Sequence, residues 1–88
     1  MAIDVDTGLD EISSRLKLVN GYADCEIIIL QHIKKQQDDG LDDEAIAVYL
    51  KKLSDRFHKK MRTGKGHPGY TNLVFAAGFV DYLLKMAT

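Results

Sequence analysis

The densest group of residues that could do chemistry is a run of basic side chains in the second half of the chain. Between residues 51 and 65 only Asp55 opposes seven positive residues, so the stretch carries a net charge of +6. The seven are Lys51, Lys52, Arg56, Lys59, Lys60, Arg62 and Lys65. The glycines of the following segment 63–69 let backbone N–H groups approach a phosphate or a carboxylate. We therefore expect an anion- or partner-binding site made by Lys59, Lys60, Arg62, Lys65 and His67.

The competing interpretation of this basic stretch is a solvated helix face that ends in a favourable basic last turn. A nucleic-acid backbone, a nucleotide or an acidic protein surface are the anions that the stretch suits. A phosphate-binding P-loop is excluded, because the Walker spacing is absent and no strand precedes the glycines.

The remaining reactive residue types do not form a catalytic or metal-binding pattern. The only cysteine is Cys25, which rules out an intrachain disulfide and predicts a buried thiol. His32 ends an apolar stripe and is expected to be a half-buried packing residue, and no histidine pair has metal-ligand spacing. We expect no catalytic residue, no metal, no cofactor and no enzymatic activity.

Two acidic segments balance the basic one. Residues 38–44 carry five negative charges and residues 4–11 carry four. The composition around Gly40 resembles a calcium loop, but the alternating ligands and the closing glutamate of an EF-hand are missing. Helix capping explains most of these acids, and an acidic docking surface is the alternative. The molecule should be strongly dipolar.

The elements that position these residues are predicted to be helices. Apolar residues recur every three or four positions from Leu9 to Ile33, with Thr7 as the N-cap, which predicts a first helix over about 7–35. A kink or break is possible at Asn20–Gly21. The same dipeptide is a strong β-hairpin signal, with 15–19 and 22–30 as strands, but the apolar residues do not alternate cleanly. We prefer the helical interpretation.

Two further helices complete the prediction. Asp42 caps a helix over 42–61 with one apolar stripe and one charged face. The segment 72–86 is apolar almost all round, which requires burial on most sides. We therefore expect an all-α fold in which a single domain, residues 1–88, forms a hairpin or bundle of three main helices.

The lengths of these helices predict a partner. A continuous first helix would be roughly 43 Å long at 1.5 Å per residue, longer than an 88-residue globule is wide. Its protruding apolar stripe must be covered by a fold-back at Gly21 or by a second subunit. We expect a homo-oligomer, first of all a dimer, completing the bundle. Its predicted interface is Leu9, Ile12, Leu16, Val19, Phe75 and Phe79.

Composition supports a folded domain and narrows the function only coarsely. The chain has 88 residues, a net charge of −1, 45 % hydrophobic and 28 % charged residues, which is ordinary for a globular protein. The acidic N-terminal segment is unlike a signal sequence and no apolar run can span a bilayer. We expect a cytoplasmic, non-enzymatic helical interaction protein, acting as an adaptor, regulator or inhibitor on a protein partner. The alternative is an anion- or nucleic-acid-binding module using the basic stretch 51–65.

Overall fold

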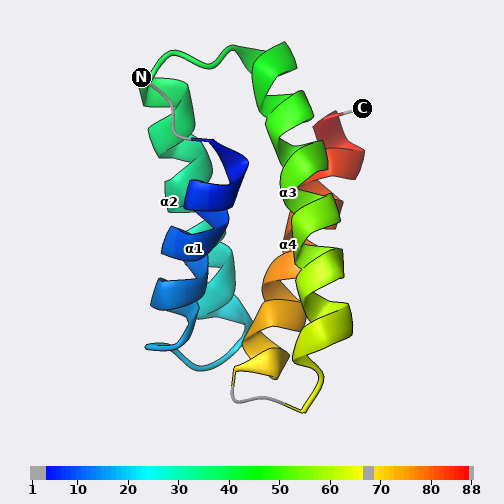
Figure 1. Cartoon of the computed structure of the whole chain (residues 1–88). Coiled ribbons are helices and arrows are strands. Elements are labelled where there is room, and N and C mark those ends of the chain that lie inside the picture. The colour runs from blue at the N-terminus through cyan, green and yellow to red at the C-terminus, as the bar shows by residue number, and fades with distance from the viewer. Residues whose placement is uncertain (1–3, 67–68, 88) are drawn as a thin grey trace.

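The protein is a bundle of four α-helices. The computed structural model describes residues 4–66 and 69–87, and no strand occurs among them. The helices are α1 (Val5–Leu16), α2 (Tyr22–Asp38), α3 (Asp43–Gly64) and α4 (Tyr70–Ala87). They run alternately down and up along a body of 36 × 21 × 21 Å (Figure 1). The all-α prediction is confirmed, but the expected number of helices was too small.

The order of the helices around the bundle differs from their order in the chain. α1 packs mainly on α2 and α3, and α4 packs mainly on α3 and α2. The diagonal pairs are therefore α1 with α4 and α2 with α3. Because α2 and α3 are consecutive, the connection 39–42 crosses the end of the bundle (Figure 1). The consequence is that the two parallel helices α2 and α4 lie side by side and share one face of the molecule.

The chain breaks between Leu16 and Tyr22, so a continuous helix over 7–35 does not form and the alternative of a break next to Asn20–Gly21 is confirmed. Gly21 has φ 97°, in the left-handed region that glycine adopts without strain. The Asn72 side chain of α4 donates hydrogen bonds to the carbonyl oxygens of Leu16 at 2.9 Å and Val19 at 2.8 Å. These bonds satisfy carbonyls that the end of α1 leaves unpaired. The β-hairpin alternative is wrong, since residues 15–16 and 22–30 are helical.

The other helix boundaries follow their caps. Asp42 accepts a hydrogen bond from the Ala45 amide at 2.8 Å, which confirms the predicted cap of α3. α1 starts two residues before Thr7, because Asp4 is the N-cap and accepts from the Thr7 amide at 2.7 Å. α3 continues to Gly64 and α4 begins at Tyr70, so the loop between them is shorter than predicted.

The apolar stripe that a second subunit was expected to cover is buried within the chain. Leu9, Ile12, Leu16 and Phe79 are core residues, and Val19 and Phe75 are partly buried against the same core. The break at 17–21 folds α2 back along α1, so the long protruding helix from which a subunit interface was predicted does not form. An interface at Leu9, Ile12 and Leu16 is therefore incompatible with this fold. Any self-association must use a different surface.

Candidate functional site

The structure brings only part of the predicted basic site together: Arg62 and Lys65 line one shallow pocket, whereas other side chains of the basic stretch point elsewhere. Arg56 is paired with Asp6 of α1 at 2.9 Å, and Lys51 with Asp55 at 3.5 Å. Lys60 lines a cavity that faces α1. Three of the predicted residues remain on the exposed surface of the end of α3 and its loop: Lys59, Arg62 and Lys65. His67 lies outside the described residues.

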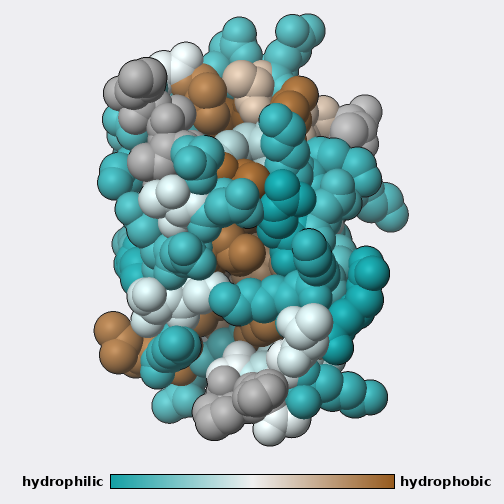
Figure 2. Space-filling model, viewed as in Figure 1, coloured by the Kyte–Doolittle hydropathy of each residue, from teal (hydrophilic) through white to brown (hydrophobic). Residues whose placement is uncertain are grey.

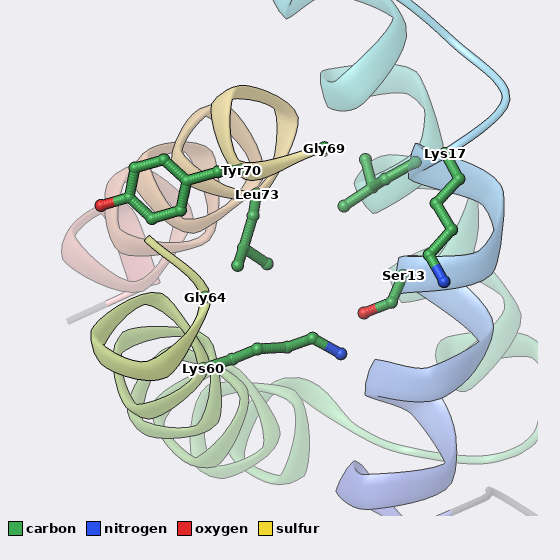
Figure 3. Close-up of a pocket in the computed structure, with 8 residues that line it drawn as sticks. Ser13, Lys17, Lys60, Gly64, Gly69, Tyr70 and Leu73 are labelled. Atoms are coloured by element: carbon green, nitrogen blue, oxygen red, sulfur yellow. The ribbon is translucent and has the colours of Figure 1, made fainter. Parts of the chain in front are cut away.

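That cavity, here called the α1–α3–α4 pocket, has a volume of about 400 Å³. Its polar lining comes from Ser13 on α1, from Lys17 directly after the end of α1, and from Lys60 on α3. Figure 3 shows the Ser13 hydroxyl and the Lys60 ammonium pointing toward one another across it. Ser13 Oγ is buried and has no hydrogen-bond partner among the described residues. The sequence did not reveal Ser13 or Lys17, because they meet Lys60 only through the fold-back of α1 and α2.

The apolar lining of the pocket comes from Leu16, Leu73 and Tyr70. Gly64 and Gly69, at the end of α3 and before α4, complete the wall. Since glycine has no side chain, neither position fills the pocket with one. The pocket can therefore accommodate an apolar group beside its cationic side chains.

A Ser–Asp–His constellation joins α3 to α4. Both Ser54 and His58 contact the carboxylate of Asp81: the Ser54 hydroxyl bonds to one oxygen, and His58 Nε2 lies 2.7 Å from the other. In a nucleophilic triad the histidine lies between the serine and the carboxylate, where it can remove the serine proton. Here the carboxylate lies in the middle, so Ser54 has no base. The arrangement clamps two helices together.

A second buried polar pair lies between α1, α2 and α3. His32 Nε2 and Tyr49 Oη are 2.7 Å apart, and both side chains are buried. Burial lowers the pKa of His32 and, with the nearby carboxylates of Glu11 and Asp4, raises the pKa of Tyr49 to about 12. At neutral pH both groups are therefore uncharged. His32 is more deeply buried than the predicted half-buried residue.

Cys25 has no exposed surface, and burial raises the pKa of its thiol. This confirms the predicted buried cysteine and makes the thiol a poor nucleophile, because the thiolate is the reactive form. Within residues 4–66 and 69–87, no three His, Cys, Asp or Glu side chains gather as metal ligands. None of the helices in the described part of the chain is long and apolar enough to cross a bilayer.

The largest group of exposed apolar side chains lies on α2 and α4. Five residues that are between 43 % and 70 % exposed come from these two adjacent helices: Tyr22, Ile27, Leu30, Tyr82 and Met86. We call this surface the α2–α4 face.

A row of aromatic rings connects Tyr22 of α2 with Tyr82 of α4 on the α2–α4 face. Tyr22 lies edge-on to Phe75 and Phe79, with centroids 5.4 Å and 6.5 Å away, and Phe79 stacks on Tyr82 at 6.1 Å. Figure 2 shows the opposite side of the bundle, formed by α1 and α3, as largely hydrophilic. Most of the exposed large apolar side chains of the described helices therefore lie on the α2–α4 face.

Comparison with known proteins identifies no relative. No protein-family model matches the chain, and no curated protein and no solved structure is significantly similar to it. The function must therefore be argued from the geometry of these surfaces alone.

Proposed function

We propose that the protein is a non-enzymatic helical interaction protein that binds a protein partner through the α2–α4 face, and that a second copy of the chain occupies it. The observation that carries the proposal is the group of exposed apolar side chains on two adjacent parallel helices. Contiguous exposed apolar patches on small globular proteins mark interaction sites.

The charges on α2 favour a second copy as the occupant. Glu26, Leu30 and Lys34 are spaced by four residues, so they lie along one side of the helix. A two-fold axis through Leu30, perpendicular to α2, sets Glu26 of each copy opposite Lys34 of the other. The apolar residues then pack against themselves at the centre, and two ion pairs flank them. Two-fold symmetry of this kind is the commonest arrangement in homo-oligomers.

A charge-reversal series tests this arrangement. Glu26→Lys places two lysines opposite one another, so we expect the dimer to dissociate at least tenfold more readily in sedimentation equilibrium. The double variant Glu26→Lys/Lys34→Glu restores opposite charges and is expected to restore the association. If the double variant is as weak as the single variant, Glu26 and Lys34 do not face one another.

An apolar pair of variants tests the face itself. Ile27→Glu introduces a charge on the α2–α4 face and is expected to give a monomer. Val48→Glu is the matched control, because Val48 is similarly exposed at 55 % but lies on α3, diagonally across from α2. Equal loss of association in both variants would show that the effect is not specific to the face.

The second candidate is the anion- or nucleic-acid-binding module, which the exposed group Lys59, Arg62 and Lys65 supports. Its weakness is that Arg56 and Lys51 are already paired with carboxylates. A complex dominated by phosphate contacts weakens steeply between low and moderate salt. We expect Lys59→Gln/Arg62→Gln/Lys65→Gln to abolish binding to a nucleic-acid duplex under this hypothesis, and retained binding would exclude it.

A further inference from the structure

The α1–α3–α4 pocket brings together groups that a small organic anion would satisfy, and it does not involve the α2–α4 face. The first of these groups is the Ser13 hydroxyl. A helical serine can bond to the carbonyl four residues earlier, but Ser13 Oγ makes no hydrogen bond with any described residue, although it is buried. A buried hydroxyl without a partner is unfavourable, and this one points into the cavity (Figure 3).

The second group is a pair of lysines, one at the C-cap of α1 and the other on α3. Lys17 and Lys60 both line the cavity, and neither ammonium is paired with a carboxylate in the described part of the chain. Two like charges on the rim of one pocket repel one another, and an anion between them converts the repulsion into two attractions. Lys60 belongs to the basic stretch of the sequence, but its function here depends on Ser13 and Lys17.

The N-terminus of α4 adds a third positive contribution to the electrostatic potential of the pocket. Gly69 and Tyr70 line the pocket at the point where this 18-residue helix begins. The first amide groups of a helix are not used within it, and the helix dipole places positive partial charge there. Two lysines, an unpaired hydroxyl and a helix N-terminus thus line one pocket.

The rest of the wall determines what kind of anion fits. Leu16 and Leu73 are hydrocarbon, and the Tyr70 ring adds an aromatic surface, so most of the exposed lining is apolar. A cavity of about 400 Å³ lies within the range of small-molecule sites. A bare inorganic ion would not fill the space beside the two leucines, and a neutral apolar molecule would leave the lysines and the Ser13 hydroxyl without a polar partner.

We propose that the α1–α3–α4 pocket binds a small organic anion that carries one carboxylate or phosphate group on an apolar body. The anionic group lies between Lys17 and Lys60 and accepts a hydrogen bond from the Ser13 hydroxyl. The apolar body packs against Leu16 and Leu73.

Three probes with a six-carbon chain and one bare head group test the proposal on the complete chain by amide chemical-shift titration. They are hexanoate, hexyl phosphate, 1-hexanol and inorganic phosphate. We expect saturable shifts at the amides of Ser13, Lys17 and Tyr70 with hexanoate or hexyl phosphate. Whichever of these two binds more tightly identifies the head group. We expect 1-hexanol and inorganic phosphate to bind at least tenfold more weakly than the better of the two.

Variants locate the binding. Lys17→Gln/Lys60→Gln is expected to lower the affinity for the tighter-binding organic anion at least tenfold, and Ser13→Ala is expected to lower that affinity severalfold. Lys59→Gln is the matched control, since this neighbouring lysine of α3 does not line the pocket. The affinity of this variant for the probe should be unchanged. Thermal unfolding of each variant without probe verifies that the fold is retained.

Three results would overturn the proposal. The first is the absence of saturable shifts with either organic anion at millimolar concentration. The second is equal affinity for 1-hexanol, which would indicate an apolar cavity alone, or for inorganic phosphate, which would indicate an adventitious ion only. The third is an unchanged affinity in a folded Lys17→Gln/Lys60→Gln variant.

Discussion

Replacing Gly8 with alanine is expected to destabilise the protein, although alanine is the better helix former. Gly8 lies inside α1, and a Cβ atom built there would come within 2.1 Å of Tyr49 Oη and 2.9 Å of His32 Nε2. These two atoms are themselves joined across 2.7 Å in the core. The added methyl group must therefore displace two buried side chains that are hydrogen-bonded to one another.

The expected loss follows from three contributions. Overpacking a filled site costs about 1–3 kcal/mol, and leaving a buried hydrogen-bonding group without its partner costs about 1–3 kcal/mol. The better helix propensity of alanine offsets about 1 kcal/mol. We expect the free energy of unfolding of Gly8→Ala to fall by about 3 kcal/mol.

Urea unfolding followed by far-UV circular dichroism measures this loss, with Gly78→Ala as the matched control. Gly78 is exposed on α4 and a Cβ atom there meets nothing within 4 Å. Its replacement should therefore raise the free energy of unfolding by about 0.5–1 kcal/mol. The double variant Gly8→Ala/Tyr49→Phe lacks the closest clashing atom and should recover part of the loss.

The result that would refute the reasoning is a Gly8→Ala protein at least as stable as the unaltered chain. In that case the close approach of α1 to the His32–Tyr49 pair is absent. Full additivity of Gly8→Ala and Tyr49→Phe would contradict the same contact, since residues in contact are expected to show a coupling energy.

Three further stability predictions follow from buried polar groups. Gln36 is fully buried, and neither polar atom of its side-chain amide has a hydrogen-bond partner in residues 4–66 or 69–87. Gln36→Met should therefore raise the free energy of unfolding in urea by about 1 kcal/mol. A loss of stability would mean that the amide is hydrogen-bonded. Asn72→Ala removes the two hydrogen bonds to Leu16 and Val19 and should lower the free energy of unfolding by about 2 kcal/mol. An unchanged free energy of unfolding would show that these bonds do not stabilise the break between α1 and α2. Because burial lowers the pKa of His32, the unfolded chain binds the imidazole proton more readily than the folded chain. The free energy of unfolding should therefore decrease as the pH falls below about 6.5. In urea midpoints measured from pH 7.5 to 5, His32→Gln should show a smaller decrease than the unaltered chain.

The sequence predicts those parts of the fold that depend on neighbouring residues. α3 is delimited by the Asp42 cap and by one apolar stripe, both of which can be recognised locally. The break between α1 and α2 was only partly predictable. Gly21 permits it, but the residue that secures it, Asn72, lies more than 50 positions away. No local pattern distinguishes a helix that breaks there from one that continues.

The candidate sites were less predictable for the same reason. The count of basic residues between 51 and 65 gave their charge but not their partners, because Asp6 of α1 neutralises Arg56 only after folding. Lys60, a member of that stretch, lines the α1–α3–α4 pocket. Its relation to Ser13 and Lys17 depends on the packing of α1 against α3, which no spacing within the sequence records.

The expected subunit interface shows how one boundary changes a functional prediction. An unbroken first helix exposes Ile12 and Leu16, whereas the broken helix buries both. The apolar surface that remains, the α2–α4 face, includes Ile27 and Leu30, which the sequence places on the same apolar stripe but which are exposed in the structure.

The mass of the unaltered chain in solution, measured by light scattering over a range of concentrations, tests the proposed self-association most directly. The two-fold arrangement on the α2–α4 face predicts twice the 9.9 kDa chain mass at high concentration, with a return toward a single chain in Glu26→Lys. A mass of one chain at every concentration would contradict it.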